Sequence, residues 1–481
     1  MVNRDKYEAV IGLEIHAQLA TNSKLFCGDA TSFGAAPNTH VSPITLGHPG
    51  TLPKTNKIAV EYAIKMGLAC NSKIATDNYF ARKNYFYPDL PKGYQISQHT
   101  TPICIGGEVK IKSSTGEKTI QLNRIHLEED AGKSIHDITP TDTLIDLNRA
   151  GTPLIEMVTE PCLHSAEDAF LYVSEVRKLV RWLGVCDGNM EEGSLRCDAN
   201  ISVRLKGETT LGTKVEVKNL NSIRNIKKAI EFEIDRLIEL KETGGNIIQQ
   251  TRSFDANNDT TFSIRDKEDA NDYRYFPDPD LAPFHLTESY IAEIKSSIPA
   301  LPAVLKNTWK SQFGLSEYDI DQLCEQKEEA DFFMALTTQT KHYKAAANWI
   351  LGPIREYLNE QQISYLDLQK SIPQLVELLE LVASNQLNFS VASGKIFKAI
   401  MDSGGSPISY AQENNLLQTN SSDEINNWIT QVLSSNPEKV AAYKKGKKGL
   451  IGLFVGEVKK LSKGKADPKV TTELLEAALL K

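Results

Sequence analysis

The stretch EEGSLRCDANISVRLKGETTLGTKVEVKN, residues 191–219, decides the fold. From Leu195 to Leu205 apolar and polar side chains alternate without interruption, which predicts a β-strand with one buried face. Lys214–Lys218 alternates in the same way, and the glycine-containing connection between the two runs predicts a hairpin. Asp198 and Glu216 would then share the polar face of this hairpin. From these two strands alone, a hairpin whose polar face is simply solvated is an equally good interpretation.

Acidic side chains recur on other expected strands. In Val10–Leu19 the residues Glu14 and His16 lie on one face, so a carboxylate and an imidazole stand side by side within reach of one cation. This pair by itself is weak evidence, because exposed Glu and His are common on strand surfaces. Glu156 lies within an otherwise apolar strand, and a buried carboxylate needs a partner.

An acidic run follows the strand that we expect near Lys118–Leu127. It reads Glu128-Glu129-Asp130, and three successive acids are unfavourable unless a cation or a basic ligand lies among them. The next residues, Gly132-Lys133-Ser134, resemble the end of a phosphate-binding loop. That motif needs a glycine where residue 127 is Leu, so we predict no phosphate-binding loop of this kind.

Basic and aromatic residues alternate around two prolines in ARKNYFYPDLPKGYQISQ, residues 81–98. Side chains of both kinds on a rigid loop can hold phosphates and stack on bases. A proline-stiffened loop that packs its aromatic rings on the core explains the pattern equally well. The residues concerned are Arg82, Lys83, Tyr85, Phe86, Tyr87, Lys92 and Tyr94.

The composition is that of a globular protein. The chain has 481 residues, of which 41% are hydrophobic and 24% charged, and this length suits two or three domains. Its net charge of -8 is small, so a polyanionic partner must bind a local basic patch. Seven scattered cysteines without a C-x-x-C pair indicate reduced thiols. The first residues enter a strand at once and no apolar run is long enough for a membrane span, so we expect a cytoplasmic protein.

The apolar periodicity changes along the chain and predicts an α+β fold. A mixed, largely antiparallel sheet with helices forms a first domain, residues 1–295. Helices are expected at 56–68, 164–183 and 223–243; the second is amphipathic, and the last two have the N-caps Ser165 and Ser222. Only helical patterns follow, and Gly404-Gly405 divides them into a helical domain, 296–403, and a tail domain, 404–481.

Residues 439–465 in the tail carry nine lysines and one acidic residue, a local charge of +8. Such a patch suits a nucleic-acid backbone, although lysine-rich helices are often only solvated faces. The contrast with the acidic remainder of the chain favours a binding function. The lysines expected to contact nucleic acid are Lys444, Lys445, Lys447, Lys448, Lys459, Lys460 and Lys463.

Several blocks of the sequence resemble, in the same order, the B subunit of the bacterial tRNA-dependent amidotransferases, the heterotrimeric GatCAB enzymes. The resemblance covers nearly the whole chain, and several blocks run for ten or more residues. The last block is similar to the family's tRNA-binding tail domain, which is YqeY-like. The blocks are VIGLEIHAQL, RKNYFYPDLPKGYQISQ, EEDAGKS, DLNRAGTPLIEMVTEP, MEEGSLRCDANISVR, KVEVKNLNS, YRYFPDPDLAP and GLFVGEVKKLSKGKADPK.

The resemblance implies a specific activity. The enzyme phosphorylates the side-chain carboxylate of Glu-tRNA(Gln) or Asp-tRNA(Asn) with ATP, and ammonia then displaces the phosphate to give Gln-tRNA(Gln) or Asn-tRNA(Asn). The A subunit releases the ammonia from glutamine, and a small C subunit completes the heterotrimer. The first domain corresponds to the family's catalytic cradle. Which of the two tRNAs is the substrate is left open.

The resemblance also implies site residues and cofactors. Metal ligands fall on Glu14, His16, Glu129, Glu156, Asp198 and Glu216, and all of these except Glu156 are also implied to be catalytic. Five carboxylates and one imidazole suit Mg²⁺, whereas zinc prefers more Cys or His. Whether Glu128 or Glu129 points inward stays open. Resemblance and charge give the ATP-site candidates Lys83, Tyr85, Tyr87, Arg149, Arg196, Asn200 and Lys218, with the two tyrosines stacking on adenine or on the tRNA 3′ end.

One departure from the family concerns zinc. Some members carry four cysteines in the early loop, whereas the matching positions here are Cys27, Asp29, Ser42 and Thr45. One sulfur ligand is too few for such a site, so we predict no structural zinc.

Two alternatives compete with this assignment. An archaeal-type relative shares the cradle but carries a large inserted domain, for which 481 matched residues leave no space. A non-catalytic tRNA-binding adaptor with the same fold would lack the acids at positions 14, 129, 198 and 216, yet all four are present.

Overall fold

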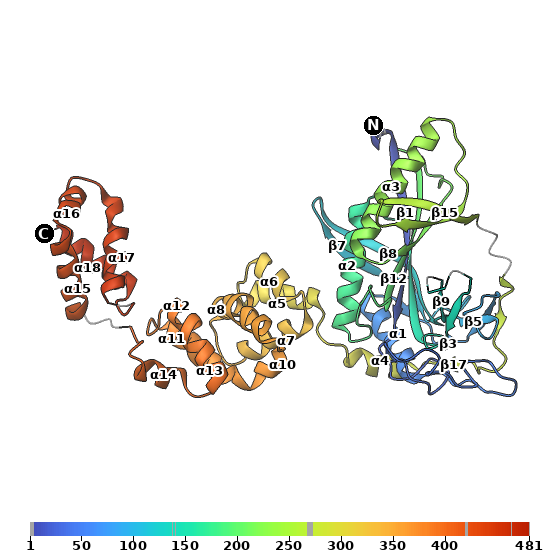
Figure 1. The fold of residues 1–481 in the computed structure, drawn as a ribbon, viewed down its shortest axis with the longest axis horizontal. Helices are drawn as coiled ribbons and strands as arrows, with labels where there is room; N and C mark the ends of the chain where they lie inside the picture. Colours follow the sequence, from blue (N-terminus) through green and yellow to red (C-terminus); the bar gives the residue numbers. More distant parts are fainter. Residues whose placement is uncertain are drawn as a thin grey trace. The chain divides into compact units, whose positions relative to one another are not determined.

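The computed structural model describes residues 4–136, 138–139, 141–266, 273–418, 422–462 and 464–480 (Figure 1). Contacts between residues divide the chain into two compact units, Met1–Leu301 and Pro302–Lys481. The first unit contains all the strands named below, and the named elements of the second unit are helices. This arrangement confirms the predicted α+β class.

The first unit is built on a large sheet. Its strands are β1 Tyr7–Gln18, β2 Lys73–Ile74, β6 Cys104–Ile105, β7 Glu108–Ser113, β8 Gly116–Glu129, β11 Pro153–Thr159, β12 Leu195–Leu205, β13 Val215–Leu220, β14 Gln250–Asp255 and β15 Thr260–Asp266. Within the described ranges the order is β15-β14-β13-β12-β1-β11-β8-β6-β2, and β7 pairs with β8. The pairing of β13 with β14 is parallel, and the other pairings of these strands are antiparallel.

Three helices pack on one face of this sheet (Figure 1). They are α1 Lys57–Ala69, α2 Ala166–Trp182 and α3 Ile223–Glu242. The side chain of Ser165 accepts a hydrogen bond from the backbone of Asp168, and that of Ser222 accepts one from Asn225, which confirms both predicted N-caps. The apolar residues of β1 and β12 are buried against these helices, so the polar residues that alternate with them face the other side.

Short strands form three smaller sheets in the same unit. They are β3 Asp77–Asn78, β4 Ala81–Asn84, β5 Tyr94–Ser97, β9 Lys133–Ile135, β10 Leu144–Asp146, β16 Phe276–Pro277 and β17 Phe284–His285. β5 lies next to the end of β8, because Ser97 Oγ is 3.2 Å from Glu128 Oε2. The loop-rich part of the unit therefore reaches the polar face of the large sheet. The helical pieces η1 Arg4–Lys6 and α4 Glu288–Ser296 complete the unit.

The second unit is a succession of helices. They are α5 Pro302–Gln312, α6 Glu317–Leu323, α7 Lys327–Thr337, α8 Tyr343–Trp349, η3 Ile350–Ile354, α9 Arg355–Gln361, α10 Tyr365–Leu368, η4 Gln369–Ser371, α11 Ile372–Ala383, α12 Phe389–Val391, η5 Ala392–Phe397, α13 Lys398–Ser403, α14 Pro407–Glu413, α15 Ser422–Ser435, α16 Pro437–Lys444, η6 Lys448–Leu450, α17 Ile451–Leu461 and α18 Pro468–Leu480. Gly404 and Gly405 have φ angles of 74° and 100° and separate α13 from α14. The division into two helical domains at this point stays a prediction.

The last four helices share a hydrophobic core. Ile425 and Ile429 of α15 are buried together with Phe454 of α17 and Leu475 of α18, and Tyr443 of α16 joins them. Helix α15 is therefore part of the structure that carries the lysine-rich segment.

Candidate functional site

Strands β1, β12 and β13 bring three carboxylates to the polar face of the large sheet. Glu14 lies directly opposite Asp198 in the register of β1 with β12. Asn200, two residues further along β12, lies opposite Glu216 on β13. Because residues i and i+2 of a strand point to the same face, all four side chains gather on one side. The predicted hairpin and its shared polar face are confirmed.

Strands β11 and β8 extend this face on the other side of β1. His16 lies opposite Glu156 of β11, and Glu156 lies opposite His126 of β8. Glu128 follows two residues after His126, so it points the same way. Five strands, from four separate segments of the sequence, therefore supply one continuous polar surface.

Glu14, Asp198 and Glu216 form a carboxylate cluster. One oxygen from each lies within 4.8 Å of the others, a spacing that suits a single bound cation. Lys218 Nζ is 2.7 Å from Asp198 Oδ2 and 3.4 Å from Glu216 Oε1. Asn200 Nδ2 donates a hydrogen bond of 2.9 Å to Glu14 Oε1.

The electrostatics of this cluster favour a positive ligand. Burial raises the pKa of Glu14, and the carboxylates of Glu156, Glu216 and Asp198 raise it further. Burial opposes the charge of Lys218, but Asp198 and Glu216 outweigh that effect and raise the pKa of the ammonium group. The cluster has three carboxylates and one ammonium group, that of Lys218. A bound divalent ion would therefore reduce the repulsion between the carboxylates.

A second group, the histidine cluster, consists of His16, His126, Glu128 and Glu156. His16 Nε2 is 3.6 Å from both Glu128 Oε1 and Glu156 Oε2. His126 Nε2 is 3.2 Å from Glu156 Oε2 and 3.5 Å from Glu128 Oε2. One atom each of His16, Glu128 and Glu156 meets the same 4.8 Å limit, so these three could also hold a cation.

The members of the histidine cluster are strongly coupled. Burial opposes protonation of His126, but Glu156 and Glu128 outweigh it and raise the pKa of the imidazole to about 9. His16 behaves in the same way, and its pKa is raised mainly by Glu156. Burial would raise the pKa of Glu156, but the two imidazoles hold it well below its usual range. Without a metal, the imidazoles themselves thus neutralise the carboxylates.

His126 and Glu128 were not among the predicted site residues. The signal was present, because Arg124, His126 and Glu128 alternate with the buried Ile125 and Leu127. We predicted that the strand ends near Leu127, whereas β8 continues to Glu129. Following the alternation two residues further would have placed Glu128 on the polar face.

Glu129, predicted as a metal ligand and a catalytic residue, is not brought into either cluster. Its Oε1 atom is 2.5 Å from Lys92 Nζ and accepts a hydrogen bond of 2.9 Å from the backbone N–H of Ile96. The two acids follow each other on β8, so they point to opposite faces. Of the two acids between which the sequence left the choice open, Glu128 therefore joins the histidine cluster and Glu129 does not, and the metal-ligand role of either acid stays a prediction.

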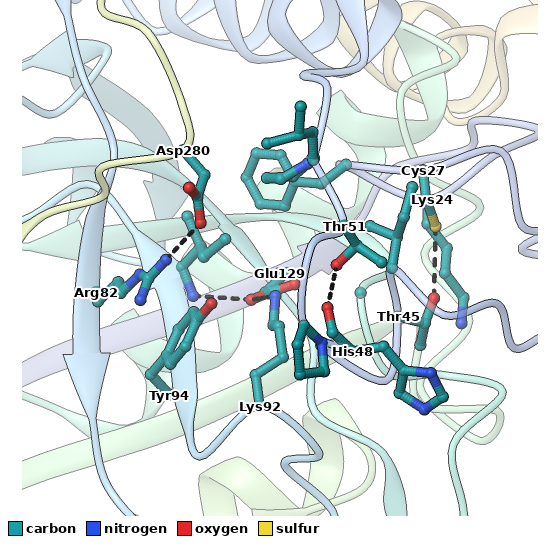
Figure 2. A pocket seen from close by; sticks show the side chains of 18 of the residues that line it. Lys24, Cys27, Thr45, His48, Thr51, Arg82, Lys92, Tyr94, Glu129 and Asp280 are labelled. Atoms are coloured by element: carbon teal, nitrogen blue, oxygen red, sulfur yellow. Dashed lines mark hydrogen bonds and ion pairs between the residues drawn. The ribbon is translucent and has the colours of Figure 1, made fainter.

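Glu129 instead lines a cavity of about 370 Å³ (Figure 2). Lys24, Arg82 and Lys92 contribute positive charge to its wall, and Asp280 pairs with Arg82 at 2.9 Å. Lys24 is almost fully buried, and burial lowers the pKa of its ammonium group. The other lining residues come mainly from the loop around residues 44–53.

Two predicted phosphate contacts, Arg149 and Arg196, lie at Asp130, the last member of the acidic run for which the sequence predicted basic partners. Arg196 Nη2 donates to Asp130 Oδ2 over 2.9 Å, and Arg149 Nε is 3.6 Å from the same oxygen. Gln18 Nε2 also donates to this oxygen, over 2.7 Å. Burial would raise the pKa of Asp130, but Arg196 and Arg149 lower it. Asp130 therefore holds the guanidinium of Arg196, whereas the guanidinium of Arg149 also donates to the backbone carbonyls of Ala131 and Gly132, over 2.9 and 2.6 Å.

Two buried polar atoms on β12 have no hydrogen-bond partner among the residues that the structure describes. They are Arg196 Nε, a donor, and Asn200 Oδ1, an acceptor, on either side of Asp198. Buried polar atoms without partners are rare and unfavourable, so they point to a ligand that supplies the missing partners. A phosphate oxygen would suit the donor, and an N–H or O–H group would suit the acceptor.

Lys83 lies beside the rings of Tyr85 and Tyr273, and Tyr87 is exposed. Lys83 Nζ is 4.8 Å from the ring centroid of Tyr273 and 5.7 Å from that of Tyr85. Burial opposes the charge of Lys83, but Glu128 leads the nearby groups that raise its pKa. The side chain of Tyr87 is 56% exposed, so stacking by this ring needs a ligand that binds at the surface.

Six of the seven predicted tail lysines fall within the described residues, and Lys463 lies outside them. All six are exposed. Lys448 Nζ lies 4.3 Å from the ring centroid of Tyr443. In the described part of the tail, none of the six forms an ion pair with a carboxylate, so their charge is available to a ligand. They are Lys444, Lys445, Lys447, Lys448, Lys459 and Lys460.

The four positions that correspond to a zinc site in some relatives lie together and are joined by hydrogen bonds. Asp29 Oδ2 accepts from Thr45 Oγ1 over 2.5 Å and from the backbone N–H of Ser42 over 2.8 Å. Cys27 Sγ is 3.4 Å from Thr45 Oγ1. A carboxylate with hydroxyl partners thus connects the loop ends at this place. The absence of zinc stays a prediction, which metal analysis of the purified protein would contradict by finding one zinc per chain.

The helices offer no candidate for a membrane span. None in the described ranges combines the length and the hydrophobicity that crossing a bilayer requires.

Comparison with known proteins found relatives along nearly the whole chain. The GatB/GatE catalytic domain family matches residues 9–292, which include every residue of both clusters, and the GatB domain family matches residues 331–479. The chain is 47% identical over 470 residues to the B subunit of the aspartyl/glutamyl-tRNA(Asn/Gln) amidotransferase of Thermodesulfovibrio yellowstonii, covering 98% of both chains. It is also 47% identical to the corresponding protein of Geotalea daltonii over 477 residues, with 98% of each chain covered, and to that of Pseudomonas syringae over 479 residues, with 98% and 99% covered.

These matches span both units and leave no substantial part of the chain unaccounted for. The chain therefore belongs to the family of GatB subunits of the aspartyl/glutamyl-tRNA(Asn/Gln) amidotransferases and contains that family's catalytic domain.

Proposed function

We propose that the polar face of the large sheet is the place where the side-chain carboxylate of a Glu or Asp residue on tRNA is phosphorylated by ATP and then amidated. The observation that carries this proposal is the meeting of the carboxylate cluster and the histidine cluster beside β1. These groups come from β1, β8, β11 and the β12–β13 hairpin, four segments that are separate in sequence. A merely solvated surface would not need to bury them.

The carboxylate cluster fits Mg²⁺. Three carboxylate oxygens within 4.8 Å of one another match the preference of this ion for oxygen ligands. Bound there, Mg²⁺ would offset the charge of the ATP phosphates. The histidine cluster is the second possible place for a cation, with His16, Glu128 and Glu156 as ligands.

The positive side chains around the clusters bind and orient the anionic reactants. Arg196 offers its orphaned Nε–H to a phosphate oxygen, while Asp130 holds the other end of the guanidinium group. Among the described residues Lys83 forms no ion pair, and its charge therefore remains available to the carboxylate or phosphate of the substrate. Tyr85 lies beside it and can stack on a base.

The proposed reaction has two steps. The substrate carboxylate attacks the terminal phosphate of ATP and gives an acyl phosphate and ADP. Ammonia then attacks the acyl carbon, inorganic phosphate leaves, and the side-chain amide forms. Water would hydrolyse the acyl phosphate, so the site must be closed to solvent while the substrate is bound.

The partners follow from the chemistry and from the names of the relatives. We infer an amidase A subunit that releases ammonia from glutamine and a small C subunit, together with Glu-tRNA(Gln) or Asp-tRNA(Asn). The exposed lysines of the tail would hold the tRNA backbone, and residues 296–403 would connect the tail to the cradle of residues 1–295. All seven cysteines are free thiols, which agrees with a reducing cytoplasm.

An amidation assay of the reconstituted three-subunit complex tests the proposal. Ammonium chloride in place of glutamine bypasses the A subunit and isolates the reaction assigned to this chain. We expect ATP-dependent amidation of at least one of the two charged tRNAs, and its loss in Glu14→Gln because this change removes one acid of the carboxylate cluster. Glu191→Gln changes an exposed acid and is the matched control. Full activity of Glu14→Gln would instead support the non-catalytic adaptor.

A further inference from the structure

Thr251 contacts the carboxylate cluster from a strand to which the sequence assigned no function. It lies on β14, directly opposite Glu216 in the parallel pairing of β14 with β13. Its side chain is 1% exposed, and Oγ1 donates a hydrogen bond of 3.0 Å to Glu216 Oε2. The hydroxyl thus binds the oxygen of Glu216 that does not face Lys218, whose Nζ lies 3.4 Å from Oε1.

The bond from Thr251 restricts the rotation of the Glu216 carboxylate through the oxygen that does not face Lys218. Glu has three side-chain torsions, and the neighbouring acids Glu14 and Asp198 repel its charge. With Oε2 bound to Thr251, rotation about the last torsion is blocked and Oε1 remains directed at the cluster. We propose that Thr251 is a positioning residue that fixes Glu216 for cation and ATP binding, an inference that rests on the proposed function of the cluster.

Strand β14 is itself attached rigidly, so it can serve as a support. Arg252, the next residue, points to the opposite face and lies 3.0 Å from the fully buried Glu233 of α3. Its guanidinium also donates to the backbone carbonyl of Thr261 on β15, over 2.8 Å. Arg236 completes the group through an ion pair of 2.7 Å with Glu233. The strand is therefore fixed to the helix on one side while Thr251 reaches the cluster on the other.

Thr251→Val in the reconstituted three-subunit complex tests this role, because valine keeps the shape and removes the hydroxyl. We expect the dissociation constant for Mn²⁺, measured by electron paramagnetic resonance, to rise about 10-fold, as is common when the partner of a metal ligand is lost. The KM for ATP should rise with it. Thr251→Ser keeps the hydroxyl, so the dissociation constant for Mn²⁺ and the KM for ATP should both stay within about twofold of the wild-type values.

Thr340→Val is the matched control. Thr340 is also buried and its Oγ1 donates 2.9 Å to a glutamate, Glu380, but in the helical unit. A general loss of stability would affect both variants, whereas Mn²⁺ affinity should fall only in Thr251→Val. Wild-type Mn²⁺ affinity and KM in Thr251→Val would overturn the proposal, even if its melting temperature fell. Failure of the serine variant to restore affinity would overturn it too.

Glu216→Gln separates this inference from the proposed function. If Glu216→Gln abolishes Mn²⁺ binding and amidation while Thr251→Val is normal, only the positioning role is wrong. If Glu216→Gln leaves both intact, the assignment of the carboxylate cluster fails, and the role of Thr251 fails with it.

Discussion

The polar face of the sheet and the lysine-rich tail are both charged regions, but they are built in opposite ways. On the sheet each charged group is held by partners on neighbouring strands, and burial and neighbours displace the pKa values of Glu14, His126 and Glu156. In the tail the six described lysines are exposed and form no ion pairs among the residues that the structure describes. The first region fixes positions, and the second supplies only charge.

This difference teaches what each region can do. Fixed and partly desolvated groups act strongly on a reacting centre, because their orientation is set before the substrate arrives. Exposed lysines contribute to binding through the number of counterions that they release, which depends on salt and little on exact placement. A single substitution should therefore abolish the function of the sheet but only weaken that of the tail.

The largest effect is expected for Asp198→Asn, which removes one charge from the centre of the carboxylate cluster. Removing a residue that hydrogen-bonds a metal ligand typically lowers metal affinity or activity about 10- to 100-fold. Removing the ligand Asp198 itself should therefore reduce the rate of amidation by more than about 100-fold. Lys218 would also lose its 2.7 Å partner. The rate is measured with ammonium chloride as nitrogen donor.

Binding of tRNA provides the control for Asp198→Asn. We expect Asp198→Asn to bind tRNA with unchanged affinity at several salt concentrations, because this change leaves the tail intact. Equal loss of tRNA binding and of amidation would show that the two regions are not separate in function.

Asp130→Asn should have the next largest effect. Asp130 Oδ2 accepts from both Gln18 and Arg196, and Oδ1 accepts from the backbone N–H of Ala131. In asparagine an NH₂ group replaces Oδ1 or Oδ2, and at either place it would meet another hydrogen-bond donor. The guanidinium of Arg196 would therefore have to move. We expect amidation to fall roughly 10- to 100-fold with a raised KM for ATP.

Asp319→Asn is the control for this variant, because Asp319 is equally buried but accepts from Lys344 and Ser316 in the helical unit. Both changes should lower the melting temperature. An unchanged KM for ATP in Asp130→Asn would mean that Arg196 does not bind the nucleotide.

Much of the polar face could be predicted from the sequence because strand periodicity is strict. The alternation from Leu195 to Leu205 gave the bounds of β12 and the side on which Asp198 lies. Serine N-caps likewise marked the beginnings of α2 and α3. These features depend only on neighbours along the chain.

The features of the site that the sequence did not predict depend on where a strand ends and on which distant strands pair. Glu128 and Glu129 differ only in which face they occupy, and this was decided by two residues at the end of β8. Thr251 reaches Glu216 through a parallel pairing whose register no local pattern specifies. The sequence indicated that Asp130 needs a basic partner, but Arg196 and Arg149 could be identified as that partner only from the fold.

Neutralising four tail lysines should have a smaller effect than either aspartate change. The Lys→Gln changes at 444, 445, 447 and 448 leave the core of α15–α18 intact, whereas deletion from residue 439 onward would expose Ile425 and Ile429 of α15. We expect tRNA affinity to fall roughly 10-fold at physiological salt, and the slope of log K against log salt to become shallower by up to about 3.

Amidation at saturating tRNA should remain normal in this fourfold variant. The same change at four exposed lysines outside the tail controls for overall charge, and it should leave the salt slope unaltered. Those lysines are Lys54, Lys206, Lys295 and Lys370. A salt slope equal to that of the wild type in the tail variant would remove the tail from the tRNA contact.

The smallest effect is expected for single changes at Lys448, and these test the idea that the tail supplies charge without fixed geometry. Lys448→Arg keeps the charge and the contact with the ring of Tyr443, so tRNA affinity should be unchanged. Lys448→Gln should weaken binding by no more than about fivefold, the value of one exposed ion pair. Filter binding across a salt series measures both. If Lys448→Arg lowered tRNA affinity as much as Lys448→Gln, the tail would recognise tRNA by defined geometry, as we propose for the binding of the reactants on the sheet.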